Sequence, residues 1–410
     1  MDMEAFLKRQ EEYKRHTREA DKERAEERKA SRRPYLDKIR GGLVGGAIGD
    51  ALGYPVEFMS WKEIRKRYGT EGIQKYEPDF ESGEALFSDD TQMSLFTANG
   101  ILLGETHGHL KGIQGPISGY VHIAYKEWLR TQEWGSDPEQ EHHCWLYEIP
   151  DLHCGRAPGT TCLSALRTGK MGSTDAPLNH SKGCGGVMRV APLALHYKPE
   201  SAADQGHLDR DGAEIAAITH GHPLGFLPAA ILTHIISIGV YGDGKLSLRE
   251  AVDEAWTAVR RMFADTVLAA DLSVMEGLIT KAEELAVTEG SDEEHIRAIG
   301  DGWTGDEALA IAVYCSLRYP DNFGKAVIAA VNHSGDSDST GAVTGNILGS
   351  WLGYEAIEEK WKSKLEMKGL LLEMADDLCY GCQMYDGEDY VDENWVRKYC
   401  EGHAGWPTVN

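Results

Sequence analysis

The chain has 410 residues, and its 42 Lys or Arg against 66 Asp or Glu give a net charge of −24. Its 41% hydrophobic and 26% charged content is ordinary globular usage, which excludes a wholly disordered chain. A nucleic-acid binder needs a basic surface to neutralise phosphates, so the acidic balance disfavours that class. No run approaches the 18 apolar residues of a membrane span and the N-terminus is charged from residue 2, so we expect no membrane span and no secretory signal.

The first 33 residues differ from the rest, because they hold 11 Lys or Arg and 9 Asp or Glu, which leaves −26 for the remainder. They contain no Gly or Pro and are built from good helix formers, with opposite charges at helical spacing in Glu4–Lys8 and Glu11–Arg15. Pro34 ends this segment. The sequence therefore predicts a charged helical extension over residues 1–34. Two interpretations stay open: a solvated arm without a specific role, or an arm that docks a face made of Met3, Phe6, Leu7 and Tyr13 on an acidic partner.

From Tyr35 onward the pattern is helical and punctuated by Gly. No alternating strand series stands out, so we predict an all-α fold in which residues 35–410 form one compact domain. Gly341, Gly345 and Gly349 recur every fourth residue, which indicates a helix face that permits close backbone approach. The other predicted helices cover residues 39–52, 91–103, part of 105–155, 213–239, 249–289 and 306–318.

Eight cysteines are spread thinly through the chain, which fits reduced thiols better than a disulfide scaffold and favours a cytoplasmic protein. Cys379 and Cys382 form a lone CxxC. Because no second pair accompanies it, we favour two ordinary helix cysteines over a zinc site. The histidines at 142, 143 and 153 show no ligand pattern either, so a solvated loop is the favoured interpretation.

Two acidic clusters stand at predicted helix starts: Ser88-Asp89-Asp90-Thr91 and Gly335-Asp336-Ser337-Asp338-Ser339-Thr340. Capping explains one such side chain at a helix start, because Ser, Asp and Thr accept bonds from free backbone N–H groups. Two adjacent carboxylates at each start exceed that need, and their repulsion would be relieved by a hard cation bound through oxygen. Capping and a shared metal site both remain open from the spacing alone.

Six segments, in order over residues 37–350, resemble the ADP-ribosylglycohydrolase family. The resemblance implies an all-α fold with a binuclear Mg²⁺ or Mn²⁺ centre, and the release of ADP-ribose from modified protein side chains. Arginine is the expected linkage, with serine-linked or small-molecule ADP-ribose as alternatives. The matching segments are Gly45–Gly53 with Glu57, Ser88–Met93, Arg156–Thr161, Lys182–Pro192, Thr219–Pro223 and Gly335–Ser339.

The resemblance also implies roles for individual residues. The metal ligands are expected to be Ser88, Asp89, Asp90, Asp336, Asp338 and Ser339. The family often has Thr where this chain has Ser88 and Ser339, and a Ser hydroxyl keeps the oxygen donor. Catalysis is expected from Glu57, Asp89 and Asp90, with Glu57 binding the second metal or ribose and assisting proton transfer, while Asp50 supports the site or caps a turn.

Substrate binding is expected from Gly183, Gly185, Gly186 and His220, with the glycine N–H groups facing a pyrophosphate. The family usually has Asn between the first two glycines, where this chain has Cys184. His220 contacts ribose or phosphate, or is a satisfied buried group. Lys182 or Arg189 could add charge, and Trp128 or Trp303 could stack on adenine or simply pack.

Two function classes follow. The leading one is a metal-dependent hydrolase acting on an ADP-ribosylated protein, since the carboxylates are kept. The second is a binding protein that blocks an ADP-ribosyltransferase toxin through residues 1–33, because some family members look like immunity proteins with such extensions. The two functions can coexist, and a purely non-catalytic immunity protein is the remaining alternative.

Overall fold

The structure is a computed structural model that describes residues 3–133, 141–384 and 391–403, with the backbone alone for residues 3–7, 9–14 and 17–18. Its described residues form helices and no strand, and two isolated bridges, Ala85 to Leu365 and Gly183 to Thr304, are the extended pairings among them. The predicted all-α fold is confirmed.

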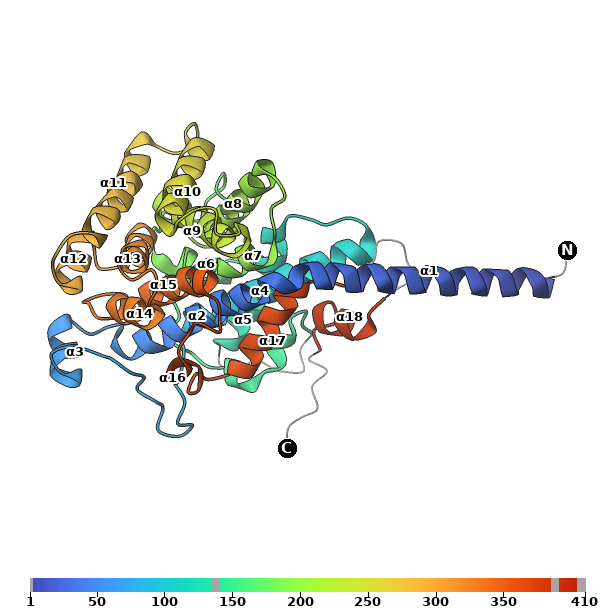
Figure 1. The fold of residues 1–410 in the computed structure, drawn as a ribbon, viewed down its shortest axis with the longest axis horizontal. Helices are drawn as coiled ribbons and strands as arrows, with labels where there is room; N and C mark the ends of the chain where they lie inside the picture. Colours follow the sequence, from blue (N-terminus) through green and yellow to red (C-terminus); the bar gives the residue numbers. More distant parts are fainter. Residues whose placement is uncertain (1–2, 134–140, 385–390, 404–410) are drawn as a thin grey trace.

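The first helix, α1 (Met3–Arg32), passes through a short 3₁₀ turn, η1 (Arg33–Tyr35), into α2 (Leu36–Gly53). Figure 1 shows the N-terminal part of α1 projecting well beyond the other helices. Its last turns are anchored, because Arg28 donates to the carbonyls of Gln383 (3.1 Å) and Met384 (2.9 Å). The face of Met3, Phe6, Leu7 and Tyr13 lies outside the described side chains.

The centre of the body is the pairing of α2 with α15 (Ser337–Leu352). Glycines of the two helices meet at three levels, so the backbones touch without side chains between them. A Cβ on Gly49 would lie 1.9 Å from the Gly341 carbonyl oxygen. The facing pairs are Gly41 with Gly349, Gly45 with Gly345 and Gly49 with Gly341. This order makes the helices antiparallel, so the end of α2 lies beside the start of α15.

The third helix of importance to the site is α4 (Asp89–Lys111), which is buried over most of its length and packs against α5 (Ile117–Thr131). The remaining α-helices are α3 (Trp61–Tyr68), α6 (Thr160–Arg167), α7 (Ala191–His196), α8 (Ala202–Ala217), α9 (Pro223–Tyr241), α10 (Leu248–Phe263), α11 (Ala269–Ala286), α12 (Asp292–Ile299), α13 (Gly305–Arg318), α14 (Phe323–Val331), α16 (Glu359–Lys362), α17 (Lys368–Tyr380) and α18 (Glu393–Tyr399).

Two predicted helices are each broken in the structure. The segment 213–239 divides between α8 and α9, because Pro223 lacks a backbone N–H and starts a new helix that the His222 side chain caps by accepting from Leu224 N (3.1 Å). The segment 249–289 divides at residues 264–268, between α10 and α11. Apolar periodicity ran across both breaks, which is why the sequence did not reveal them.

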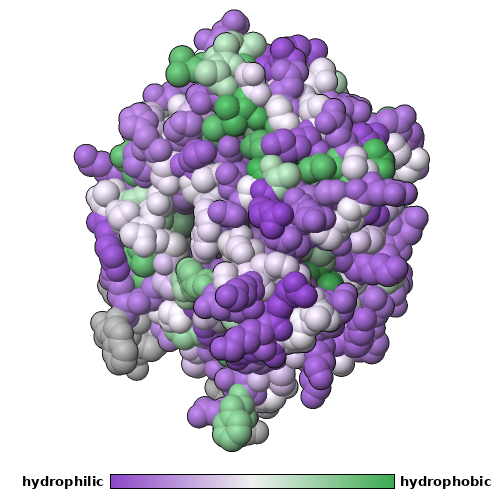
Figure 2. All heavy atoms as spheres, turned by 90° about the vertical axis from the view of Figure 1, so that its left-hand side faces the viewer, coloured by the Kyte–Doolittle hydropathy of each residue, from purple (hydrophilic) through white to green (hydrophobic). Residues whose placement is uncertain are grey.

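Helix α9 has the length and apolar content of a membrane span, but 94% of that window is buried inside the protein. It is therefore the core helix of the body. Figure 2 views the face on the side away from the projecting α1 and shows a mainly hydrophilic surface with hydrophobic residues in separate small patches.

Candidate active site

One pocket of about 330 Å³ collects the chain's acidic clusters and its glycine loop. It is lined by Glu57 and Phe58, a few residues past the end of α2, by the starts of α4, α6 and α15, and by the 3₁₀ turn η5 (Cys184–Gly186). The predicted site residues in its lining are Glu57, Asp89, Asp90, Gly183, Gly185, His220, Asp336, Asp338 and Ser339. Ser88 and Gly186 lie beside the pocket and are not in its lining.

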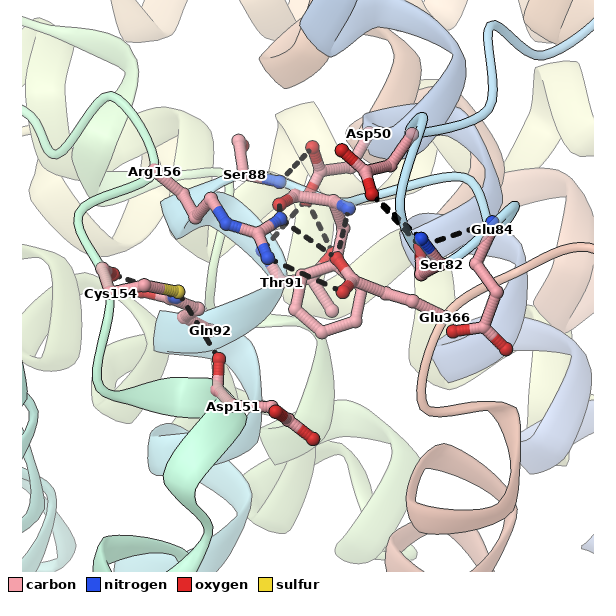
Figure 3. A network of polar contacts seen from close by, with 12 residues as sticks. Asp50, Ser82, Glu84, Ser88, Thr91, Gln92, Asp151, Cys154, Arg156 and Glu366 are labelled. Atoms are coloured by element: carbon pink, nitrogen blue, oxygen red, sulfur yellow. Dashed lines mark hydrogen bonds and ion pairs between the residues drawn. The ribbon is translucent and has the colours of Figure 1, made fainter.

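The start of α4 is held by a capping network. The Ser88 hydroxyl accepts from Asp90 N (3.2 Å), and the Asp50 carboxylate accepts from Ser88 N (2.8 Å), Thr91 N (3.0 Å) and the Thr91 hydroxyl. Figure 3 shows Asp50 reaching this turn, with Arg156 directed at Glu366, to which it forms an ion pair at 3.1 Å. Asp50 therefore supports the turn that carries Asp89 and Asp90, which is one of the two roles predicted for it.

The start of α15 repeats this device. Asp336 caps the helix, because its Oδ1 accepts from Ser339 N (3.2 Å), and Asp338 Oδ1 accepts from the same N–H (2.9 Å). Gly335 enters this turn at φ +138°, and a Cβ there would lie 1.9 Å from the Asp301 carbonyl oxygen. Capping uses Oδ1 of each aspartate, and both side chains line the pocket.

Glu57 follows the turn η2 (Tyr54–Val56) at the end of α2 and is 7% exposed, so it is not a surface glutamate. Burial, and then the charges of Asp336 and Asp89, raise the pKa of Glu57 to about 9. Its Oε2 atom has no hydrogen-bond partner among the described residues. Glu57 is therefore a protonated carboxyl group beside the two aspartate pairs when no cation is bound.

The aspartates are perturbed in the same direction. Burial raises the pKa of Asp89 to about 8, although its Oδ2 accepts from Gly159 N (3.1 Å). Burial, and then neighbouring carboxylates, raise the pKa of Asp90 and of Asp338 well above the usual range. No Lys or Arg is among the described residues that line the pocket.

This donor set fits hard divalent cations. Carboxylate and hydroxyl oxygens are the ligands that Mg²⁺ and Mn²⁺ prefer, and bound cations would offset the burial and the mutual repulsion that raise these pKa values. The Asp90 Oδ2 atom is buried without a partner in the described part of the chain, which a cation would also satisfy.

The glycine loop is tightly fixed. A Cβ on Gly185 would lie 2.8 Å from His220 Cε1, and one on Gly186 would lie 2.7 Å from the Gly225 carbonyl oxygen. The backbone N–H of Gly183 donates to Ser181 Oγ (3.3 Å) and that of Cys184 to the Trp303 carbonyl (3.2 Å). These two N–H groups are therefore engaged within the protein, and Gly186 serves packing.

His220 is buried, with Nδ1 2.8 Å from the Thr219 hydroxyl. Burial, and then the Arg189 charge, lower the pKa of His220 to about 3, so the imidazole is neutral and can exchange hydrogen bonds with a ligand. Arg189 is fully buried, donates to Thr219 Oγ1 (2.6 Å) and lies over the Tyr125 ring. It is structural, and Lys182 pairs with Asp306 (3.8 Å) outside the lining.

The pocket also contains residues to which the sequence assigned no role in the site, and Trp303, which it offered for stacking or packing. The start of α6 contributes Ala157 to Cys162, with Ala157 in a left-handed conformation at φ +56°. The Gly159-Thr160-Thr161 sequence before an apolar helix was the available signal, and it was interpreted only as a matching segment. Phe58 and Trp303 stack at the mouth, with ring centroids 5.8 Å apart. Trp128, by contrast, is buried and donates to Gln92 Oε1 (3.1 Å), so its role is packing.

A second possible metal-binding group lies apart from this pocket. His142 Nε2 and His403 Nδ1 lie 3.7 Å and 2.8 Å from Glu148 Oε1. The prediction of a solvated loop is wrong for His142, whose side chain is 7% exposed. His142 Nε2 is also 3.0 Å from the Gly402 carbonyl, and His153 Nε2 is 2.7 Å from the Tyr147 carbonyl. These ring nitrogens thus have partners within the protein.

All eight cysteines are free. Cys379 lies in α17, but Cys382 follows the helix end at Gly381, so only one of the CxxC pair is a helix cysteine. Cys184 differs in its surroundings, because it lies among the pocket carboxylates and its thiol donates to Asp336 Oδ2 (2.7 Å). Burial, and then the charges of Asp336 and Asp90, raise the pKa of the Cys184 thiol well above its usual range.

The described residues thus form an all-helical protein with a buried carboxylate cluster beside a glycine loop, which is a candidate hydrolytic site. Comparison with known proteins makes the class specific: the chain belongs to the ADP-ribosylglycohydrolase family, whose profile matches residues 31–387. It is accordingly an enzyme that releases ADP-ribose by hydrolysis.

The relatives cover most of the chain. The ADP-ribosyl-[dinitrogen reductase] glycohydrolase of Rhodospirillum rubrum is 26% identical over 81% of this chain and 91% of its own length. ADP-ribosylhydrolase ARH3 of Bos taurus is 23% identical over 81% and 89%, and ADP-ribosylarginine hydrolase Tri1 of Serratia proteamaculans is 24% identical over 84% and 80%. A solved ADP-ribosylglycohydrolase-related protein shares the fold, with a TM-score of 0.55 and 23% identity over 84% of this chain and 98% of that chain.

Proposed function

We propose that this protein hydrolyses the N-glycosidic bond between ADP-ribose and a protein arginine side chain, using two Mg²⁺ or Mn²⁺ ions. The observation that carries the proposal is the convergence of Glu57, the Asp89–Asp90 pair and the Asp336–Asp338 pair on one pocket without a cationic side chain. The arginine linkage is supported by the relative that is named an ADP-ribosylarginine hydrolase.

We also propose that residues 35–410 act as one catalytic unit in the cytoplasm, where free cysteines are stable.

The metal ligands in this proposal come from two helix starts. Asp89 and Asp90 form one set, with Ser88 capping their helix beside the pocket, and Asp336, Asp338 and Ser339 form the other. When bound, the two ions would supply the positive charge that holds the ribose hydroxyls and an attacking water. The helix N-termini add positive dipole ends that favour ionised carboxylates at these positions.

Glu57 is the proposed proton carrier. Water adds to C1 of the ribose while the bond from C1 to the guanidine nitrogen breaks, and one proton of that water must reach the departing nitrogen. Without a cation the pKa of Glu57 is raised to about 9, and bound cations would lower it, so this carboxyl group can exchange the proton near neutral pH. Its unpartnered Oε2 atom is available for the exchange. Asp89 and Asp90 act beside it by orienting the water.

The rest of the substrate is held by neutral groups. The N-terminus of α6, with Gly159, Thr160 and Thr161, offers backbone N–H groups suited to a diphosphate. His220 and the Gly183–Gly185 loop bound the opposite wall, where a side chain would close the space. The stacked pair of Phe58 and Trp303 offers an aromatic surface for adenine.

The test is single-turnover release of ADP-ribose from an arginine-modified protein, with Mn²⁺ or Mg²⁺ and with EDTA. We expect release only with the cation, and slower or no release from a serine-modified protein. Asp89→Ala should remove cation uptake in calorimetry together with turnover, whereas Asp271→Ala, at the start of α11 and away from the pocket, should change neither. Equal release in EDTA, or normal cation uptake by Asp89→Ala, contradicts the proposal.

A second function is proposed for the arm: residues 1–33 bind and block an ADP-ribosyltransferase. It is supported by the projection of α1 beyond the body and by the start of the family match at residue 31. Asp21 and Ala25 are buried and Arg28 is anchored, so the projecting part is best removed alone, by deleting residues 1–18. Binding to an arginine-specific transferase domain should fall while hydrolase turnover persists. Unchanged binding, or no binding by the full chain, removes this role.

A further inference from the structure

Two histidines and one glutamate join two segments of the chain that are far apart in sequence. His142 Nε2 lies 3.7 Å from Glu148 Oε1, and His403 Nδ1 lies 2.8 Å from the same oxygen. One ligand atom from each of the three residues lies within 4.8 Å of the other two. Two ligands of a tetrahedral Zn²⁺, each bound at about 2.1 Å, lie about 3.4 Å apart. The two distances to the glutamate oxygen lie on either side of that spacing, so small side-chain movements suffice to bind an ion.

The first two of these residues are held in place by helix α5. Glu127 of α5 is 5% exposed, and its carboxylate accepts from His143 N and Cys144 N, each at 2.8 Å. The turn η3 (Trp145–Glu148) follows, is buried over its first three residues, and ends on the glutamate of the cluster. The His142 side chain, just before this anchored backbone, is 7% exposed. Packing against the core therefore positions this side of the cluster.

The third residue is brought to the cluster by the C-terminal helix α18. Trp395 Nε1 donates to Thr106 Oγ1 (2.8 Å), which fixes α18 on α4. Gly402 then turns the chain at φ +74°, and a Cβ on it would lie 2.8 Å from the His142 carbonyl oxygen. A glycine adopts this left-handed conformation without strain and permits the close approach. The two sides of the cluster are thus anchored independently, and His403 is placed against them.

The donor set differs from that of the carboxylate pocket. Two imidazole nitrogens and one carboxylate oxygen, with water in a fourth position, are a common ligand set for Zn²⁺. Mg²⁺ and Mn²⁺ prefer sites made of oxygen alone. His142 Nε2 is also 3.0 Å from the Gly402 carbonyl oxygen. A bound ion replaces this contact and the contact between His403 and Glu148, and the proton of each neutral ring then lies on its other nitrogen.

We propose that His142 Nε2, Glu148 Oε1 and His403 Nδ1 form a second metal site, which binds one Zn²⁺ and fastens the C-terminal segment to the turn η3. The ligands are two neutral imidazoles and an ionised carboxylate, so binding involves no electron transfer. The role of the ion is structural. The inference is independent of the proposed function, because none of the three residues lines the carboxylate pocket.

The probe is Zn²⁺, titrated by calorimetry into the full-length protein after EDTA treatment and removal of the EDTA, with saturating Mg²⁺ present. We expect one Zn²⁺ site that His403→Gln and Glu148→Gln each weaken roughly tenfold or more. His207→Gln, which alters an exposed histidine of α8 outside the cluster, is the matched control and should keep the site. Asp89→Ala should also keep it, because this change affects only the pocket. Circular dichroism verifies that the variants fold.

Equal Zn²⁺ affinity in wild type, His403→Gln and Glu148→Gln overturns the inference. Loss of the Zn²⁺ site in Asp89→Ala also overturns it, because the ion would then have bound in the carboxylate pocket. Loss in His207→Gln would indicate an adventitious surface site and overturns it as well. Absence of turnover under any cation leaves the Zn²⁺ titration unaffected and bears on the proposed function alone.

Hydrogen exchange tests whether the ion fastens the C-terminal segment. At a free Zn²⁺ concentration about ten times its Kd, exchange of the α18 amides should slow roughly tenfold, because opening this segment requires release of the ion. The same slowing is expected in His207→Gln and not in His403→Gln. Exchange that Zn²⁺ leaves unchanged in wild type would contradict the fastening role.

Discussion

Gly49 of α2 and Gly341 of α15 touch backbone to backbone, so that a Cβ on either would lie within 2.4 Å of the other's carbonyl oxygen. This contact sets the distance between two helices whose ends carry the site. Glu57 follows α2 and Asp336 precedes α15, and the antiparallel pairing brings them to the same pocket. The spacing of the glycines thus determines the spacing of the carboxylates.

Gly341→Ala should lower the free energy of unfolding by about 3 kcal/mol, because the methyl group meets backbone that cannot move aside as a side chain would. Gly277→Ala is the control: this glycine is exposed inside α11 with no atom near its Cβ position, so Ala should stabilise by about 0.5–1 kcal/mol. Urea denaturation followed by circular dichroism measures both. Equal effects would mean that the two helices are not in the described contact.

In EDTA, the free energy of unfolding should fall as the pH rises from about 4 to about 9. The pKa values of Asp50, Asp89 and Glu57 are raised to about 6, 8 and 9, above the roughly 4 of the unfolded chain. The folded state therefore binds more protons than the unfolded state across this window, and each proton lost destabilises it.

Saturating Mg²⁺ should reduce the pH dependence of the free energy of unfolding, because a cation stabilises the ionised carboxylates of the folded state. Thermal melts at several pH values, with and without Mg²⁺, provide the measurement. Stability that increases with pH in EDTA, or slopes that are the same under both conditions, would show that these carboxylates are not clustered as described.

Glu57→Gln should reduce turnover by about 10²–10⁴-fold, since the amide cannot carry the proton that the reaction requires. The same change should raise stability in EDTA at pH 8, because the variant lacks the carboxyl group whose ionisation the folded state opposes. Glu71→Gln, on an exposed glutamate outside the pocket, should alter neither quantity. Loss of turnover together with loss of stability would instead indicate a structural role for Glu57.

Trp303→Ala should raise KM roughly tenfold with little change in kcat, because aromatic stacking contributes to binding and not to bond cleavage. Its backbone carbonyl, which accepts from Cys184 N, is kept by the substitution. Trp303→Phe preserves an aromatic face and should retain most of the affinity. A selective fall in kcat in Trp303→Ala would contradict a binding role and indicate that the residue orders the glycine loop.

Much of the helical content could be predicted from the sequence. The charged extension, the glycine-rich helix before Glu57 and the apolar helix after Asp90 follow from composition and a 3.6-residue period. The breaks at 218–222 and 264–268 could not be predicted, because apolar periodicity continues through them and tertiary packing decides where each helix ends. One of these breaks contains His220, so the error in the helix prediction fell within the site.

The candidate site was only partly predictable. Paired aspartates at two helix starts are visible as motifs, and at the start of α15 capping explains one oxygen of each aspartate. Ser88 belongs to the first acidic motif and Gly186 to the glycine loop, yet both lie outside the pocket lining. Phe58 could not be found by any pattern, since an exposed aromatic residue becomes informative only through its partner Trp303.

The sequence by itself determined the residue types that can bind a cation, the glycines that permit two helices to meet, and the helical class, because local propensity and periodicity act between near neighbours in the chain. Only the tertiary structure decided that Asp90, Asp336 and Cys184 share one pocket. Burial and mutual repulsion depend on distances between segments that are far apart in sequence, and those distances arise only when the helices pack.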